Sequence, residues 1–111
     1  MRNGKLRHRI RLEVPIKEQD SATGEDVITG YQELATVWAS FEPLSARDLV
    51  AAQAAKSQVT ARIVTRYREG LSATMRAVHR GQVYSVHGVL PDPKSGREYV
   101  TLPVSEGVRN G

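Results

Sequence analysis

The chain has 111 residues, of which 40% are hydrophobic and 25% charged, and its 16 basic and 12 acidic side chains give a formal net charge of +4. This length suffices for one compact domain and is too short for two, and the composition is typical of a globular protein rather than a disordered one, so we expect a single domain over residues 1–111. The absence of cysteine excludes disulfides, cysteine-based zinc sites and thiol catalysis.

Charge is divided unevenly along the chain. Residues 1–11 carry five basic and no acidic side chains, residues 12–42 carry seven acids and only Lys17, and the remainder is basic again. This division favours electrostatic association with a partner. No apolar stretch follows the basic start and no run approaches the roughly 20 apolar residues of a membrane span. We therefore expect no secretory signal, no membrane contact and a chain that stays in the cytoplasm where it is made.

The first expected strand covers residues 6–14, where apolar side chains alternate with charged ones at the two-residue period of a half-buried strand. We expect Pro15 to end it. Residues 17–30 contain turn-forming residues and few large apolar groups, which predicts a mobile, exposed loop that serves as a contact arm. The acids expected to meet a neighbouring molecule are Asp20, Glu25 and Asp26, whose spacing does not match that of a calcium loop.

Residues 31–41 form the next expected strand, and its two faces both carry apolar or small side chains. Such a strand belongs in a central position of a barrel or at a subunit interface, where the second face is also shielded from water. The candidate contacts with a neighbouring subunit are Val37, Trp38 and Phe41. For Trp38, the sole tryptophan, a core position is the commoner alternative, and its indole N–H then needs a partner.

A helix-start pattern follows Pro43. Ser45 is a favourable N-cap, Asp48 stands three residues later, and an alanine-rich stretch continues to Lys56. We expect one short helix within residues 44–58. A helix of about eleven residues is marginal alone, so it needs a partner surface, either another copy of the chain or the open end of a barrel.

Residues 58–68 alternate again and predict a long strand with three arginines on its wetter face. These candidates for contact with DNA phosphates are Arg62, Arg66 and Arg68. Tyr67 falls in the apolar phase of the strand, so the interleaved exposed aromatics of a single-strand binding platform are not expected. Only non-specific attraction to a polyanion is therefore predicted.

The remaining residues predict a hairpin and a last strand. Residues 75–78 and 82–90 flank His79-Arg80-Gly81, a short connection typical of a β-hairpin. A final strand is expected over residues 98–104, and the polar tail 105–111 is expected to fray.

Together these elements predict a mainly β fold. We expect a small antiparallel β-barrel of about six strands, with one short α-helix inserted between the second and third barrel strands. A closed barrel is preferred because it hides the strand edges that would otherwise promote aggregation.

No pattern of catalytic, metal-binding or cofactor-binding residues is found in the sequence. The three histidines are scattered, the glycines lie singly at turns, and no serine has the surroundings of a nucleophile. We therefore expect a protein that is not an enzyme and that has no catalytic residues, cofactor or metal. The histidines expected to be structural are His8, His79 and His87.

Short motifs in a distinctive order add a family resemblance. They are Gly4-Lys5-Leu6-Arg7-His8-Arg9-Ile10, Thr36-Val37-Trp38-Ala39, Glu42-Pro43-Leu44-Ser45, Ile63-Val64-Thr65-Arg66-Tyr67-Arg68 and Gly81-Gln82-Val83-Tyr84-Ser85-Val86. With them the chain resembles the phage head–tail joining family, the head-closure or stopper proteins of long-tailed phages. The resemblance implies a non-enzymatic structural protein of the virion, encoded by a phage or prophage and made in the cytoplasm of the bacterial host.

The resemblance also implies an assembly. Copies are expected to form a ring, dodecameric in the virion with a monomer as the free form, beneath the portal and adaptor proteins, where the ring closes the DNA-filled head and receives the tail proteins. Residues 44–58 are then expected to face the channel, and the arginines above to face packaged double-stranded DNA. The start of this plug or ring-contact segment is Leu44, Ser45, Ala46, Arg47, Asp48 and Leu49.

One departure from the family pattern bears on the closing role. Ala46 stands where glycine is more usual, which favours a firm helix over a segment that refolds as a plug. Joining is therefore expected more firmly than closing. Two alternatives stay open: a separate, non-specific nucleic-acid-binding barrel, whose affinity would fall steeply with salt, and another neck or tail-terminator morphogenesis protein of similar shape.

Overall fold

The computed structural model of the protein describes residues 6–93 and 98–106. Within them the chain forms mainly strands and one short helix. The elements are β1 (His8–Gln19), β2 (Asp26–Pro43), α1 (Ala46–Ala54), β3 (Ala61–Arg66), β4 (Arg76–His79), β5 (Gln82–Val86), β6 (Leu90–Pro91) and β7 (Tyr99–Glu106). The prediction of a mainly β fold with one short helix is confirmed.

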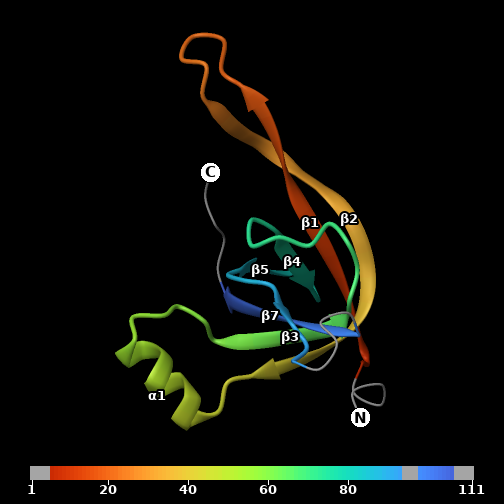
Figure 1. Ribbon diagram of the computed structural model, residues 1–111, viewed down its shortest axis with the longest axis vertical. Helices are drawn as coiled ribbons and strands as arrows, with labels where there is room; N and C mark the ends of the chain where they lie inside the picture. Colours follow the sequence, from red (N-terminus) through yellow and green to blue (C-terminus); the bar gives the residue numbers. More distant parts are fainter. Residues whose placement is uncertain (1–5, 94–97, 107–111) are drawn as a thin grey trace.

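The seven strands form one antiparallel sheet, in the order β3-β2-β1-β4-β5-β7-β6. An additional pairing joins β3 at one end of this order to β7, so six of the strands close into a ring and only the short β6 stays outside it. Figure 1 shows β3 and β7 side by side below the β4–β5 hairpin, with β1 and β2 along the right-hand side of the view. Closure leaves few unpaired edges on the ring, which is the physical reason that a small β protein favours it.

The core lies inside this ring. Ile10, Leu12, Ile63 and Leu102 are fully buried there, and each comes from the apolar phase of its strand. The basic phase of β1 points the other way, because Arg9 and Arg11 are exposed. The two-residue alternation therefore determines which face of each strand points inward.

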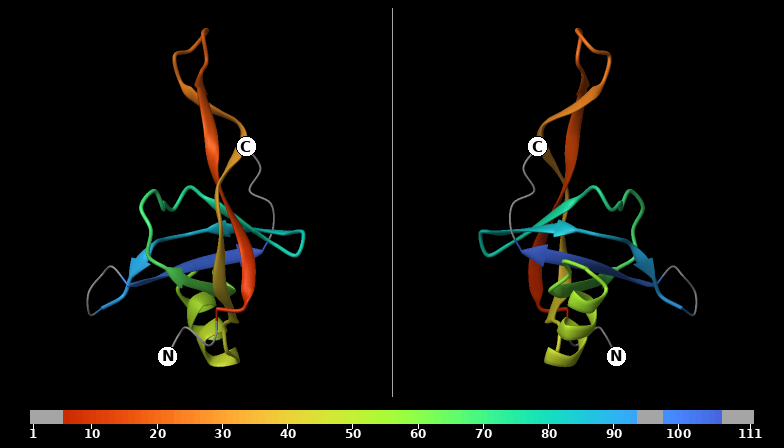
Figure 2. Two further views of the ribbon diagram at one scale, coloured as in Figure 1. Left: turned by 90° about the vertical axis from the view of Figure 1, so that its right-hand side faces the viewer. Right: turned by 90° about the vertical axis from the view of Figure 1, so that its left-hand side faces the viewer.

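The first two strands are longer than the ring requires and form an arm. β4 pairs with β1 only as far as Glu13, whereas β1 and β2 stay paired out to Gln19 and Asp26. We call residues 14–32 the arm. It rises from the body at one end of the 50 Å long axis, with α1 at the opposite end (Figures 1 and 2).

The arm corrects two sequence expectations. Pro15 does not end the first strand, since it pairs with Tyr31 in the middle of the hairpin. Beyond Glu13 the strand has a single neighbour, so one of its edges needs no hydrogen bonds and proline is tolerated. The prediction of an irregular loop over residues 17–30 is also wrong at both ends of that range. Residues 17–19 and 26–30 belong to strands, and only the turn at residues 20–25 lies outside them.

Two irregularities in the pairing shape the arm. The register of β1 against β2 shifts between Leu12 and Glu13, and again between Ile16 and Lys17. At these two shifts Leu34 and Thr29 of β2 have no residue opposite them on β1, which makes each shift a β-bulge. Bulges bend a strand and increase its twist, and Figure 1 shows the hairpin curving away from the body.

The later elements agree with the sequence analysis in kind but differ in length. The β4–β5 hairpin turns at Arg80 and Gly81, both with positive φ, as a two-residue turn requires. β3 covers six residues of the eleven expected, and α1 covers nine. β7 continues through Ser105 and Glu106, which were expected in a frayed tail, while residues 107–111 lie outside the described part.

Candidate interaction surfaces

The turn of the arm brings the three predicted acidic contact residues together. The backbone closes through hydrogen bonds from the Asp20 N–H to the Glu25 carbonyl and from the Gly24 N–H to the Asp20 carbonyl, each 2.7 Å long. The Asp20 carboxylate also accepts the Ala22 N–H at 2.8 Å, and Gly24 has the positive φ that this turn needs. The expected loop is thus a hydrogen-bonded turn that presents acidic side chains.

The arm also exposes apolar side chains. Ile16, Val27 and Ile28 are 36%, 42% and 38% exposed, respectively. No element of the described chain other than β1 and β2 pairs with this part of the hairpin. A two-stranded hairpin is only marginally stable alone in water. The arm is therefore a surface that gains stability when a partner covers it.

A charged cluster holds the base of the arm to the body. The buried carboxylate of Glu13 accepts hydrogen bonds from Arg11 at 2.8 Å and from Arg76 of β4 at 2.7 Å. Burial alone would raise the pKa of Glu13, but the hydrogen bonds from Arg76 and Arg11 outweigh it and hold the pKa below 4.5. The Arg76 guanidinium also lies 3.9 Å from the centre of the Tyr31 ring. Three strands are thereby tied together where the arm leaves the ring.

Basic and aromatic side chains gather on the outer face of the body. We call Arg9, Trp38, Arg66, Tyr67 and Arg68 the arginine–aromatic patch. Trp38 is 53% exposed and Tyr67 is 41% exposed, and together with Arg66 and Arg68 they line a hollow of about 280 Å³. The core position considered for Trp38 is wrong, and Tyr67 is not in an apolar phase because β3 ends at Arg66.

Strand register explains why these residues meet. Arg9 lies directly opposite Trp38 in the β1–β2 pairing, and its guanidinium is 5.0 Å from the centre of the indole ring. The Thr65 hydroxyl donates a hydrogen bond to the Trp38 carbonyl at 2.8 Å, which places Arg66 next to Trp38. Arg66 in turn lies opposite Tyr99, with its guanidinium 5.6 Å from that ring. Cationic and aromatic side chains thus alternate across four strands.

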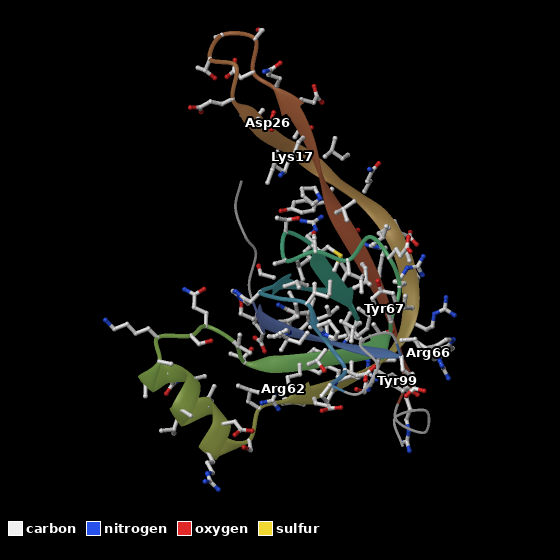
Figure 3. The ribbon with its side chains drawn as sticks, in the orientation of Figure 1. Lys17, Asp26, Arg62, Arg66, Tyr67 and Tyr99 are labelled. Carbon is white, nitrogen blue, oxygen red and sulfur yellow. The ribbon has the colours of Figure 1, made fainter. Side chains whose placement is uncertain are left out.

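The three predicted phosphate-contacting arginines do not form one basic face. Arg66 and Arg68 belong to the patch, whereas Arg62 is 3.7 Å from the Asp48 carboxylate of α1. Arg62 also lines a separate hollow of about 460 Å³ whose walls include Glu42 and Asp92. Figure 3 shows Arg62 on the side of the body toward α1, away from Arg66 and Tyr67. Arg62 is therefore in mixed-charge surroundings that suit a phosphate poorly.

Two of the predicted subunit contacts are engaged within the chain itself. Val37 and Phe41 are half-buried and pack against the core. The expectation of two apolar faces over residues 34–41 fails because Ala39 and its phase point inward, while the other phase is mixed: Thr36 and Trp38 are exposed and Ser40 is buried. Trp38 is thus the outward-facing residue among the three.

The predicted plug segment lies outside the ring and is open to solvent. Ser45 caps α1, because its hydroxyl accepts the Asp48 N–H at 3.1 Å, as the sequence predicts. The Leu44 N–H donates a 3.0 Å hydrogen bond to the carbonyl of Thr60, the residue just before β3. No residue of α1 is buried, and Val50 is 65% exposed. The helix projects from the body, to which the ion pair of Asp48 with Arg62 of β3 connects it.

A histidine pair was not foreseen from the sequence. His8 Nδ1 and His79 Nε2 are 3.2 Å apart, within hydrogen-bond distance, and the His79 ring stacks on Phe41 with 5.2 Å between ring centres. Burial lowers the pKa of His79 below 6.5, and the nearby positive charges of His8 and Arg80 act in the same direction. The two residues are 71 positions apart, so only the pairing of β1 with β4 could reveal their contact.

The third histidine also has a side-chain partner, since His87 Nε2 lies 2.7 Å from the Ser105 hydroxyl, within hydrogen-bond distance. Among residues 6–93 and 98–106 no group of three or more histidine and carboxylate side chains is arranged to hold a metal ion. Over the same residues, the helix is neither long nor apolar enough to span a membrane.

Comparisons with known proteins cover almost the entire chain. The model of a family described as phage head completion protein matches residues 1–107. The solution structure of protein SF1141 from Shigella flexneri 2a is similar, with 30% sequence identity, a TM-score of 0.72 and coverage of 99% of this chain and 100% of the other. A comparison with curated proteins found no match.

Proposed function

The chain belongs to the phage head completion protein family, and from this membership we propose that it is a structural protein of the phage or prophage head–tail connector that joins the DNA-filled head to the tail. The observation that carries the proposal is the match over residues 1–107, because it spans body, arm and helix together. The role is one of assembly rather than catalysis.

The shape of the molecule supports a joining role. Both the arm and α1 project from the ring of strands, at opposite ends of the molecule, and each exposes apolar side chains that the described chain does not cover. Elements of this kind are stabilised by docking on other molecules. We propose that the closed ring of strands is the β-barrel body from which these two elements reach neighbouring proteins.

The proposed assembly is a ring of identical copies, taken as twelve, formed from free monomers when heads are completed. One face of the ring meets the adaptor and portal proteins and the other receives the tail proteins. The protein would then reside in the virion, after assembly in the cytoplasm of the bacterial host. A cyclic assembly needs a heterologous interface whose rotation closes, and the two unlike projecting elements of this chain suit that requirement.

Closure of the channel, as a role in addition to joining, would depend on α1. α1, within residues 44–58, would face the channel as a short capped helix. The Ser45 cap and the alanine-rich sequence favour a preformed helix over a segment that refolds. Closure would therefore come from helices of neighbouring copies meeting across the channel.

Electron microscopy of assembled connectors tests the joining role. Heads from a phage that lacks this gene should lose their DNA or fail to accept tails, and supplying the chain should restore both. Micrographs of restored particles should show the chain as a ring next to the adaptor. A normal yield of infectious particles without the gene, or a ring located at the tail end, would reject the proposal, and the second result would favour a tail-terminator role.

Direct binding of nucleic acid is a second candidate function that one observation favours. Exposed Trp38 and Tyr67 lie beside Arg66 and Arg68, as in surfaces that stack bases and hold phosphates. If this were the function, the monomer would bind DNA, and its affinity would fall steeply between low and moderate salt. Fluorescence titration of labelled single- and double-stranded DNA measures this. Binding that is weak at all salt concentrations would exclude it.

A further inference from the structure

The arm and the arginine–aromatic patch are complementary to each other. From residue 16 to residue 28 the arm carries four acids and one lysine together with exposed Ile16, Val27 and Ile28. The patch carries three arginines and two exposed aromatic rings, and no carboxylate lines its hollow. Each surface therefore offers both the charge and the apolar area that the other lacks.

The two surfaces are far apart within one molecule. Figure 3 shows Lys17 and Asp26 near the end of the arm, and Arg66 and Tyr67 on the body below it. The arm is a continuous two-stranded hairpin up to its turn, and its base is fixed by Glu13, Arg11 and Arg76. In this structure the arm therefore does not cover the patch of its own chain.

We propose that the tip of the arm of one copy docks on the arginine–aromatic patch of the next copy. The acids Glu25 and Asp26 meet Arg66 and Arg68, while Ile28, which lies on the same face of β2 as Asp26, packs against Trp38 and Tyr67. This contact joins unlike surfaces, so it repeats from copy to copy and closes into a ring when the rotation per copy allows. The inference rests on the proposed ring and names the residues that hold it together.

The patch suits this occupant better than it suits nucleic acid. Arg9 is already stacked on Trp38 and Arg66 on Tyr99, so their guanidinium groups are partly engaged, and Arg62 lies elsewhere beside Asp48. Only a few phosphates could therefore be neutralised at once. Protein interfaces are enriched in tryptophan, tyrosine and arginine at their centres, and the aliphatic side chains of the arm provide the area to cover them.

Disulfide trapping tests the contact directly, because the natural chain has no cysteine. A chain with Asp26→Cys and Tyr67→Cys is used to complete heads, and the isolated connectors are oxidised. We expect a ladder of covalent multimers on a non-reducing gel. The matched controls carry Asp26→Cys alone or Tyr67→Cys alone, and since a single thiol per chain allows at most a dimer, neither should give a ladder. Absence of the ladder from normally formed connectors, or an equal ladder from a control, would overturn the contact.

Charge exchange provides a second, independent measurement. Arm variant Glu25→Lys/Asp26→Lys and patch variant Arg66→Glu/Arg68→Glu should each lower the yield of connectors by at least about tenfold, because like charges then face each other. Combining all four changes should restore most of the yield, whereas failure to restore it would contradict the pairing.

Two further results separate this inference from the others. If wild-type chains form no ring on heads, the proposed function fails, and the docking contact fails with it. If connectors form normally with the patch variant while that variant loses DNA binding shown by the wild type, the patch is a nucleic-acid site and the docking inference is wrong.

Discussion

Trp38 is a residue for which sequence favours a core position, whereas the structure leaves its side chain half exposed. It occupies the outward phase of β2, beside Arg9 of β1 and Arg66 of β3, while its neighbours Val37 and Ala39 turn inward. A large aromatic side chain that stays half exposed is more informative than a buried one, because burial is its usual state. Its position marks the centre of the candidate interface.

Replacement of Trp38 by alanine should have little effect on the stability of the monomer. The side chain is 53% exposed, so we expect the free energy of unfolding to fall by less than about 1 kcal/mol, which covers the lost contact with Arg9. Leu102→Ala is the matched control, since Leu102 is fully buried and should cost about 2–5 kcal/mol. Urea denaturation measures both. Equal losses would mean that Trp38 supports the core after all.

His79 should make stability depend on pH. Its pKa in the folded protein is lowered from 6.5 by burial and by the charges of His8 and Arg80, so the unfolded chain binds the proton more readily. Its stabilising contribution is therefore complete above pH 6.5 and is lost as the pH falls through the lowered value.

The His79→Phe variant should lose less stability than the wild type on acidification below pH 6.5, while keeping the stack on Phe41. Melting temperatures across this range provide the comparison. An NMR titration of the wild type should in addition give a His79 midpoint below 6.5. A midpoint at or above the ordinary value would show that the proposed cause is wrong.

At the scale of elements, the arm differs from everything else in the fold. The strands of the ring are held on two sides, whereas the arm has one pairing, two bulges and exposed apolar residues. Glu13 binds Arg76 at the base of the arm, so the hairpin is held to the body there, whereas residues 14–32 beyond it pair only with each other. We therefore expect the arm to be dispensable for folding and available for assembly.

Shortening the arm should separate these two properties. Residues 17–29 are replaced by Asn-Gly, which joins the paired Ile16 and Gly30 through a two-residue hairpin turn. We expect the melting temperature of the monomer to change little, because no strand of the ring other than β1 and β2 pairs there. Connector formation should be lost. A body that no longer folds would show that the arm contributes to the core.

At the scale of the whole molecule, charge is divided along the long axis. Four of the seven acids of residues 12–42 lie on the arm, and the arginine–aromatic patch on the body is basic. The net charge of +4 is therefore the sum of an acidic end and a basic body. Such a molecule favours head-to-tail contact with its own kind.

Salt should weaken this contact without abolishing it. The range of electrostatic interaction shrinks from about 10 Å at 0.1 M salt to about 3 Å at 1 M, so the charged part of the interface is screened while the apolar part is retained. Sedimentation of isolated connectors over this range should show partial release of subunits. Complete insensitivity to salt would indicate that the acids of the arm are not in the interface.

Much of the fold could be predicted from local patterns. The inward face of β1, the turn at Arg80 and Gly81, and the cap at Ser45 each depend on residues adjacent in sequence. The predictions failed where a partner strand decides the outcome. Pro15 is tolerated because β4 ends before it, and residues 17–30 are mostly strand because two polar segments pair with each other.

The sequence by itself determined the class of fold, the family and the separation of acidic from basic segments, because alternation, capping and charge are local properties of the chain. Only the tertiary structure decided which side chains share a surface. It brought Arg9, Trp38, Arg66 and Tyr99 into one row and moved Arg62 beside Asp48. Strand register sets these neighbours, and register depends on pairing between segments that are distant in the chain.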